Sequence, residues 1–445
     1  MGLHFALAVA SLLGLLGAVA LLVVLTVRGI NLFVATPVCA LVIALTSHLP
    51  MLPQLVQAAE GNLLALYMQG FTGFIANWFF MFLLGSIFGK LMELSGAAES
   101  IARWVIVRTG RAHAALAVVL ACAVLTYGGV SLFVVAFSVY PTAVALFREA
   151  NLPRRFIPAA LSFGSVTFTM TSAGSPEIQN WIPIQFLHTS PWAAWEASLV
   201  VAVFMAVLGY WCLTAMLRRA QARGERFESR ATDVSMNRTS LPHVALALLP
   251  PTTVSMVSFV LHEQLQTSAL IVALLAGSAM IPLACGRHLR ETGRAIAEGS
   301  TGALVAIGNT AAVVGFGTVA KAAPAFGVAV EWLAGSGEGG IAGAVFAVSI
   351  IAAITGSASG GQAIALPLLA PALLASGVNP DHIHRAVAIS SGVLDSLPHN
   401  GYVVTTIRAI CGETHRAAYV PVGILTVIVP GLGLLLCLAL FATGL

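Results

Sequence analysis

Two short polar stretches interrupt apolar segments that are each long enough to cross a bilayer, and they are matched between the two halves of the chain. The first is Thr171-Ser-Ala-Gly-Ser-Pro-Glu-Ile-Gln-Asn180 and the second is Gly392-Val-Leu-Asp-Ser-Leu-Pro-His-Asn-Gly401. Each contains a proline, which ends a helix and leaves backbone carbonyls without partners. Irregular backbone at membrane depth persists only where protein or a wet cavity covers it. A pair of such breaks, one in each half, indicates the binding site of a secondary transporter.

The composition places the whole chain in a membrane. Of its 445 residues, 58% are hydrophobic and only 9% are charged, whereas about a quarter of a soluble domain is charged. The chain is therefore predicted to be an all-α polytopic membrane protein. The first apolar run, Leu3 to Val27, has no basic residue before it. We interpret it as a retained helix, the alternative being a cleaved signal peptide.

Apolar runs of about 20 residues, which are long enough to span, predict ten transmembrane segments. These are 5–27, 30–49, 70–92, 156–187, 194–217, 244–262, 267–285, 301–320, 386–407 and 418–443. Two further apolar stretches, 112–147 and 341–376, have small, polar centres at Thr126 to Ser131 and at Thr355 to Gln362. Each is long for one helix and lacks the charges of an exposed loop. We predict that both are re-entrant hairpins whose tips meet near the membrane midplane.

The distribution of basic residues supports this layout. With the N-terminus outside and both hairpins re-entrant, 19 of the 21 Lys and Arg residues fall on the cytoplasmic side, as the positive-inside rule requires. Only Lys321 and Arg385 fall outside. The layout predicts that both termini are periplasmic, that the first hairpin opens to the cytoplasm and that the second opens to the outside.

The order of elements predicts two inverted repeats, residues 1–217 and 244–445, joined by a polar cytoplasmic linker at 218–243. Each repeat contains five transmembrane segments, one of them broken, and one re-entrant hairpin. Because five is odd, the second repeat must be inverted relative to the first, as in many transporters. The basic run of the linker is a topology signal, with lipid head-group binding as a further possibility. Residues 96–111 are predicted to form a short interfacial helix.

The hairpin tips and the breaks supply the predicted substrate-binding residues. Half-helices that begin at the tips present free amides and partial positive charge, which suit a carboxylate. The neutral side chains of the breaks suit a hydroxylated acid, because a hydroxyl group both donates and accepts. The alternatives are that the small tip residues pack helices and that the polar groups only cap the broken helices. The predicted residues are Tyr127, Gly128, Gly129, Ser131, Thr171, Ser172, Ser175, Gln179, Asn180, Thr355, Ser357, Ser359, Gly360, Ser396, His399 and Asn400.

Asp395 is the acidic residue that most clearly points to ion coupling. It lies well inside a predicted span, where ionisable groups are costly and by default mark ion or proton pathways. His399, four residues further on, is of the residue type that changes charge near neutral pH. We predict that Asp395, with His399, carries a coupling proton. The alternative is an N-cap for the half-helix that begins near Ser396, and Glu177 is the corresponding, weaker candidate in the first break.

The remaining polar residues carry less information. Asn309 and Thr310 are expected to pack in a Gly-rich span, and Asn77 is expected to bond a neighbouring helix. An exposed charged loop is expected at the outer mouth, although its charges could also attract an anion; it comprises Asp381, His382, His384 and Arg385. The six cysteines are scattered singly, so neither a disulfide framework nor a metal site is expected. No nucleophile–base pair or nucleotide motif points to an enzyme.

In several motifs the chain resembles the gluconate:proton symporter (GntP-type) family of the ion transporter superfamily. They are Tyr127-Gly-Gly-Val-Ser-Leu-Phe133 with Tyr140-Pro141, Thr167-Phe-Thr-Met-Thr171 running into Gly174-Ser-Pro-Glu-Ile-Gln-Asn180, Gly356-Ser-Ala-Ser-Gly360, and Asp395-Ser-Leu-Pro-His-Asn400. The resemblance covers nearly the whole chain. It implies a homodimer, a scaffold and a mobile transport domain in each protomer, an elevator mechanism, and substrates such as gluconate, other sugar acids and 3-hydroxybutyrate. The tips lack the Ser-Asn-Thr motif of sodium-coupled dicarboxylate relatives, which argues against sodium.

Together these observations predict a symporter of the bacterial inner membrane that moves a small organic anion and binds membrane lipid but no nucleic acid. No cofactor is expected, and a proton is the expected coupling ion. A sodium-coupled or uncoupled carrier of the same fold remains an alternative, and an anion channel is a more distant one. The sequence does not name the substrate, because neutral, hydroxyl-rich sites fit several such acids equally well.

Overall fold

The computed structural model describes residues 2–28, 30–51, 61–109, 113–130, 132–230, 240–265, 268–289, 291–326, 328, 340–375 and 377–444. All regular elements in these ranges are helices, as expected for the predicted fold class. The longer ones are α1 (Gly2–Val27), α2 (Leu32–Thr46), α3 (Leu63–Leu94), α4 (Ala97–Thr109), α5 (Ala114–Tyr127), α6 (Leu132–Glu149), α9 (Trp195–Ala222), α10 (Val244–Leu265), α11 (Ser268–Cys285), α12 (Thr292–Ala322), α14 (Gly340–Thr355), α15 (Ala358–Ala375), α16 (Pro380–Ser391) and α19 (Val429–Ala442). The shorter α-helices are α7 (Ile157–Ser162), α8 (Ile184–Leu187), α17 (Gly401–Val404) and α18 (His415–Gly423).

Capping side chains fix where several of these helices begin. The Asn62 side chain accepts a hydrogen bond from the Ala65 amide at the start of α3. Asn379 caps α16, whose first residue is a proline. Proline suits this position because the amide that it lacks would have no partner within the helix. These local signals set the start of a helix independently of the apolar runs that set its length.

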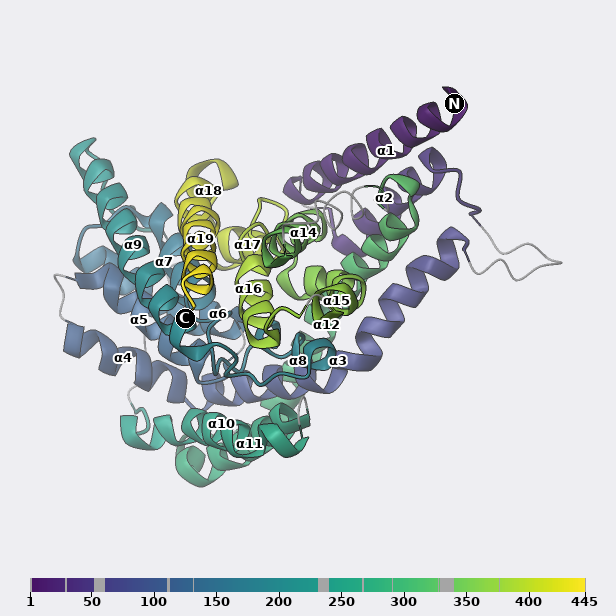
Figure 1. The fold of residues 1–445 in the computed structure, drawn as a ribbon. Coiled ribbons are helices and arrows are strands. Elements are labelled where there is room, and N and C mark those ends of the chain that lie inside the picture. Colours follow the sequence, from purple (N-terminus) through teal and green to yellow (C-terminus); the bar gives the residue numbers. More distant parts are fainter. Residues whose placement is uncertain are drawn as a thin grey trace.

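The long helices α3 and α12 form an antiparallel pair that crosses the middle of the molecule (Figure 1). Glycines let their backbones approach closely: a Cβ at Gly299 would lie 2.7 Å from the Ile87 Cα, and one at Gly315 would lie 2.9 Å from the Tyr67 carbonyl oxygen. Small residues at such contacts are typical of helix pairs in membranes. The pair therefore forms a tightly packed wall. The remaining helices are arranged around it, with α1 against α2 and α10 against α11 (Figure 1).

Both stretches predicted as hairpins are helical hairpins. The first pairs α5 with α6, and the second pairs α14 with α15. Their turns use glycines in the left-handed conformation, with φ of +84° at Gly129 and +58° at Gly356. The first arms have 14 and 16 residues, about 21 and 24 Å at 1.5 Å per residue. Each is therefore shorter than a hydrocarbon core of about 30 Å.

The two broken spans differ from the predicted boundaries. In the first, α7 continues as a π-helix only to Thr167, and turns and short helices replace the predicted helix up to residue 187. In the second, α16 begins at Pro380, six residues before the expected start at 386, and a non-helical stretch separates it from α17. The interfacial helix expected at 96–111 corresponds to α4. The breaks are thus real, and in the second α17 continues as a π-helix to Ile410, so that helical segments of similar length lie on both sides of it.

Among the described residues, seven helical segments are long and apolar enough to cross a membrane. They are Leu63–Leu94, Trp195–Ala222, Val244–Leu261, Ser268–His288, Thr292–Ala322, Ala358–Ala375 and His415–Ala442. Two shorter apolar segments, Val9–Leu25 within α1 and Leu32–Thr46, which is α2, correspond to the first two predicted spans. The segment Ala358–Ala375 is α15, an arm of the second predicted hairpin. Its length alone therefore does not distinguish a crossing helix from a re-entrant one.

Candidate functional site

A cavity of about 850 Å³ brings together the four segments singled out in the sequence. Its lining includes Gly129 from the first tip, Gln179 from the first break, Ser357 from the second tip, and Asp395 from the second break. The wall opposite these segments is formed by α3 and α12, with Met81 to Glu93 and Ala297 to Val313 contributing lining residues. Segments more than 260 residues apart in the chain thus meet in this central cavity.

The predicted binding residues divide into two groups. Those that line the central cavity are Gly129, Gln179, Ser357, Ser359, Asp395, Ser396 and Asn400. Those that lie outside its lining are Tyr127, Gly128, Thr171, Ser172, Ser175, Asn180, Thr355, Gly360 and His399. Ser131 lies outside the described residues. The second group supports the backbone of the tips and breaks, as the following contacts show.

Asp395 faces the central cavity from a nearly closed environment. Its side chain is only 5% exposed, and its carboxylate accepts a hydrogen bond of 2.9 Å from the Ser396 hydroxyl. The Ser396 carbonyl in turn accepts one from the Tyr419 hydroxyl at 3.2 Å. No cation forms an ion pair with Asp395 within the described part of the chain. The carboxylate is therefore held by neutral groups and reaches solvent through the cavity.

His399 and Asn400 join the second break to the second tip. The His399 Nε2 atom lies 2.9 Å from the Ala353 carbonyl oxygen, and its ring fills the space that a side chain at Gly356 would need. The Asn400 amide donates to the Gly356 carbonyl at 3.0 Å, while its oxygen accepts from the Val403 amide at the start of α17. Asn400 thus both caps a half-helix and lines the cavity.

Arg385, which was expected in an exposed loop at the outer mouth, is completely buried within α16. Its guanidinium donates to the carbonyls of Thr171, Pro191 and Ala193 and to the side-chain oxygen of Asn180. The expectation was wrong because helical order begins at Pro380, which turns this charge inward beneath the first break. A buried charge requires such partners. Arg385 therefore satisfies the carbonyls that the first break leaves unpaired.

His384 is also buried, again in contrast to the exposed position that was expected. Its Nδ1 atom lies 2.6 Å from the Thr189 hydroxyl, and its Nε2 atom lies 3.4 Å from the Asn180 side-chain oxygen. The Asn180 amide donates to the carbonyls of Ser175 and Pro191. Asn180 is therefore fully engaged in holding the first break, as the capping alternative proposed.

Gln362, on α15, connects the two breaks directly. Its side-chain nitrogen donates to the Gln179 carbonyl at 3.0 Å and to the Ser391 hydroxyl at 2.9 Å, and the residue is fully buried. Gln362 borders the second predicted tip, and no role was expected for it. Residue spacing in the sequence could not predict these contacts, because the two partners of Gln362 come from different halves of the chain.

The tips themselves are stabilised by short internal contacts. The hydroxyls of Ser357 and Ser359 lie 3.3 Å apart, and the Ser357 hydroxyl accepts from the Gly360 amide. Within the described chain, the Thr355 hydroxyl bonds only to the nearby carbonyls of Ala352 and Ser357. In the first tip the Tyr127 hydroxyl donates to the Ala173 carbonyl, and a Cβ at Gly128 would lie 2.5 Å from the Pro251 Cβ. Tyr127 therefore braces the first break, and Gly128 allows close contact with α10.

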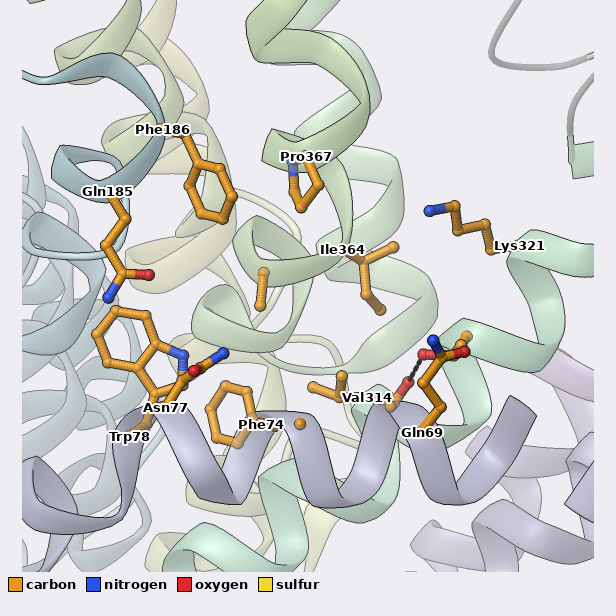
Figure 2. A pocket seen from close by; sticks show the side chains of 14 residues that line it. Gln69, Phe74, Asn77, Trp78, Gln185, Phe186, Val314, Lys321, Ile364 and Pro367 are labelled. Carbon is orange, nitrogen blue, oxygen red and sulfur yellow. Dashed lines mark hydrogen bonds between the residues drawn. The ribbon is translucent and has the colours of Figure 1, made fainter. Parts of the chain in front are cut away.

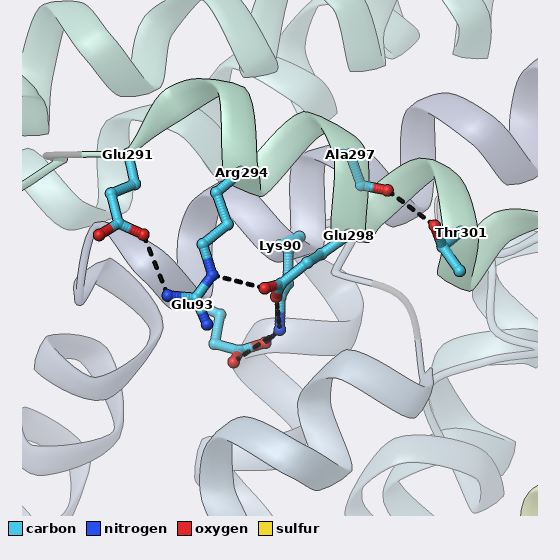
Figure 3. Close-up of polar contacts among 7 residues, drawn as sticks. All are labelled: Lys90, Glu93, Glu291, Arg294, Ala297, Glu298 and Thr301. Atoms are coloured by element: carbon cyan, nitrogen blue, oxygen red, sulfur yellow. Dashed lines mark hydrogen bonds and ion pairs between the residues drawn. The ribbon is translucent and has the colours of Figure 1, made fainter.

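The α3–α12 wall contributes polar lining residues that were expected to pack in a Gly-rich span. Asn309 and Thr310 line the central cavity. At the end of the wall nearest the starts of α4 and α12, the Lys90 ammonium lies 3.0 Å from a Glu93 oxygen and 3.1 Å from a Glu298 oxygen (Figure 3). Arg294 pairs with Glu298 and Glu291 in the same cluster. Lys90, Glu93 and Glu298 also line the cavity.

A second pocket, of about 430 Å³, lies further along the same helix pair (Figure 2). Its lining includes the amide side chains of Gln69, Asn77 and Gln185 and the ammonium-bearing Lys321. Asn77 was expected to bond a neighbouring helix, but it faces this pocket instead. The two cavities share no lining residue.

Among the described residues, no group of three or more His, Cys, Asp or Glu side chains could hold a metal ion. The cavity offers hydroxyls, amides and two carboxylates, those of Glu177 and Asp395, together with the paired charges at its mouth. Such a set can bind a small polar molecule and exchange a proton with it.

Comparison with known proteins gives a consistent picture. The family model described as GntP family permease matches residues 10–268. The transporter YxjC of Bacillus subtilis is 34% identical over 456 aligned residues, which cover 92% of this chain and 94% of that protein. A transporter of Haemophilus influenzae is 26% identical, covering 72% and 74%. Among solved structures, the YdaH transporter of Alcanivorax borkumensis has a TM-score of 0.56 at 14% identity, covering 95% and 98%, which shows a shared fold.

Proposed function

Because this chain belongs to the GntP family of permeases, which are multi-pass membrane transporters and not enzymes, we propose that it is a secondary active symporter for a small hydroxylated organic acid. Gluconate, another sugar acid or 3-hydroxybutyrate fits the chemistry of the site. The observation that carries the proposal is that both tips and both breaks line one cavity. Converging interrupted helices are how such carriers build a binding site at membrane depth.

The lining suits an acid that also carries hydroxyl groups. Residues Ser357 and Ser359 stand at the start of α15, an 18-residue helix whose first amides and positive dipole end favour an anionic group. Gln179 and Asn400 add amide groups, which can pair with hydroxyls as donors or acceptors. The carboxylate of the substrate would lie toward the α15 end, and its hydroxyls toward the breaks.

Proton coupling follows from the placement of Asp395. An anionic substrate in the same cavity as an unpaired carboxylate experiences repulsion, which protonation of Asp395 removes. Substrate and proton would therefore bind together. His399 would share the proton, because its Nδ1 atom is buried without a hydrogen-bond partner among the described residues and can accept one. In this arrangement no metal ion is required.

The central cavity lies between the α3–α12 wall and the segments that carry the tips and breaks, and this position supports an elevator mechanism. On one side lies the tightly packed α3–α12 wall, and on the other lie the hairpin tips and breaks, which are braced to one another by Gln362 and Asn400. We assign the wall to a fixed scaffold and the braced segments to a moving transport domain. The proposal includes two inverted repeats, a homodimer, a location in the bacterial inner membrane and periplasmic termini.

Purified protein in liposomes tests the coupling directly. Wild-type protein should accumulate labelled gluconate against its gradient when the outside is acidic, and Asp395→Asn should lose this accumulation while retaining gluconate exchange. Glu196→Gln, at an exposed position outside both cavities, is the control and should leave accumulation unchanged, whereas Glu177→Gln tests the other carboxylate of the cavity. Unchanged accumulation by Asp395→Asn would rule out this residue as the proton carrier. Accumulation driven by a sodium gradient would instead favour sodium coupling, and ohmic current would favour a channel.

A further inference from the structure

The chain has two lysines, Lys90 and Lys321, and each lines a different one of the two cavities. Lys90 is neutralised by Glu93 and Glu298 at the mouth of the central cavity (Figure 3). Lys321 forms no ion pair or hydrogen bond with any described residue, and its side chain is exposed. The two cavities therefore differ in the charge that they can offer to an anion.

The second pocket has the other features of a small-anion site. Its three amide side chains, from Gln69, Asn77 and Gln185, form no hydrogen bonds within the described chain and remain available to a ligand. The aromatic rings of Phe74, Trp78 and Phe186 supply apolar walls (Figure 2). In Figure 2 the Lys321 side chain extends from the end of α12 toward this space. A volume of about 430 Å³ lies within the range of small-molecule sites.

The pocket lies at the opposite end of the wall from the charged cluster. The two cavities divide α3 and α12 between them, with the second pocket lined by Gln69 to Trp78 and Val314 to Lys321. Arg294 and Lys321 lie at opposite ends of α12, about 40 Å apart at 1.5 Å per residue. The Arg294 end carries several basic residues and is the proposed cytoplasmic end, so that Lys321 lies on the outer side.

Two segments separate the cavities, and both are close to the Gln362 brace. On α15, Ser359 faces the central cavity and Ala363 faces the second pocket. In the segment after the first break, Gln179 faces the central cavity and Gln185 faces the second pocket. A solute passing from one cavity to the other must therefore cross, or move with, the braced segments.

We infer that the second pocket captures the carboxylate of the organic acid on the outer face, with Lys321 as its cationic anchor and the three amides as further donors. This inference rests on the proposed transport of organic anions. Of the two basic residues assigned to the outer side, Arg385 is enclosed by carbonyls, which leaves Lys321 to attract an anion. The organic acid is then released at the Lys90 end of the central cavity, where this lysine is already paired with Glu93 and Glu298.

Sided transport measurements test the inference. Labelled gluconate uptake is measured in right-side-out and in inverted membrane vesicles for wild type, Lys321→Gln and Lys321→Arg. Lys321→Gln should raise KM about tenfold from the outer face at low salt, leave kcat and the KM from the inner face unchanged, and lose most of this effect in high salt. Lys321→Arg, which keeps the charge, should stay near wild type. An outer-face KM that is unchanged in Lys321→Gln, or raised equally on both faces, overturns the inference.

A binding measurement separates failure of this site from failure of the proposed function. Sodium gluconate, with sodium chloride as the ionic control, should raise the unfolding temperature of purified wild type and of Asp395→Asn, which retains the second pocket. It should stabilise Lys321→Gln less. If wild type transports no organic acid but shows this pattern, the anion site stands and the transport proposal fails. If gluconate stabilises wild type and Lys321→Gln equally, or stabilises neither, the site is refuted.

Discussion

The two breaks look alike in sequence, yet the structure holds them in different ways. The first break is fixed by a buried cation, Arg385, together with His384 and a fully engaged Asn180. The second is fixed by neutral contacts from His399, Asn400 and Tyr419, and its acid, Asp395, faces the central cavity. Both breaks also place an acid, Glu177 or Asp395, on the lining of the central cavity. The difference in bracing supports the proposal that Asp395, in the break without a buried cation, carries the coupling proton.

The largest effect is expected at Arg385. Arg385→Met would leave the carbonyls of Thr171, Pro191 and Ala193 buried without donors, at a cost on the order of 3–5 kcal/mol. The variant should unfold at a much lower temperature than wild type in detergent, or fail to fold. Arg287→Met, at an exposed position, is the control and should behave as wild type. A stable Arg385→Met protein would mean that the first break does not depend on this cation.

The two asparagines should separate stability from binding. Asn180→Ala removes a residue that bonds Ser175, Pro191 and Arg385, and should cost about 2–3 kcal/mol of stability with little change in KM. Asn400→Ala removes a helix cap and the bond to the Gly356 carbonyl and should cost about 1–2 kcal/mol, but should raise KM because Asn400 lines the cavity. Unfolding midpoints and gluconate KM values check both. If instead Asn180→Ala raises KM and Asn400→Ala mainly lowers stability, the first break would bind the substrate and the second would be the support.

The tip glycines should show the same asymmetry on a smaller scale. Gly129 and Gly356 have a left-handed backbone, so replacing either one with alanine should cost about 1–2 kcal/mol of folding stability. At Gly356 the added Cβ would also lie 2.6 Å from the His399 ring, whereas at Gly129 its nearest neighbour is 3.1 Å away. Gly356→Ala should therefore lower the unfolding temperature and the uptake rate more than Gly129→Ala. Equal effects of the two substitutions would show that the His399 ring can move to make room for the added methyl group.

The smallest effect is expected at the segment that connects the two halves, where Glu225 and Arg230 form ion pairs with residues of the first and the second half. Arg155 binds Glu225 at 2.6 Å, and Arg230 binds Glu413 at 2.7 Å. The Arg155 guanidinium holds the pKa of Glu225 below its usual range, so this pair stabilises the folded state above the unfolded pKa and loses its effect as pH falls through the folded value. Glu225→Gln should cost less than about 1 kcal/mol at pH 7. The difference in unfolding temperature should shrink as the pH falls below about 4 and vanish once the pH is below the folded pKa of Glu225. A difference that does not shrink would exclude the ion pair as its cause.

Some of the candidate site could be predicted from residues alone, because its signals are local. Pro176 and Pro398 stand among Gly, Ser and Asn residues, a combination that indicates an interrupted helix, whereas Pro367 in apolar surroundings stays inside one. The small, polar tip sequences indicate turns. Asp395 was identifiable as a costly acid in an apolar segment. By contrast, Gln362, Asn309 and Thr310 carry no local signal that distinguishes packing from lining. Arg385 was misplaced because its partners, around Thr171 and Ala193, lie about 200 residues earlier.

By itself, the sequence determined that the chain is helical, that it lies in a membrane and that two segments are interrupted, since these properties depend on hydropathy and on the backbone chemistry of proline and glycine. Tertiary structure decided which polar groups support the breaks and which face a cavity. The physical reason is that an unpaired carbonyl or a buried charge accepts any partner that reaches it in the right geometry, and only the folded chain determines which partner that is.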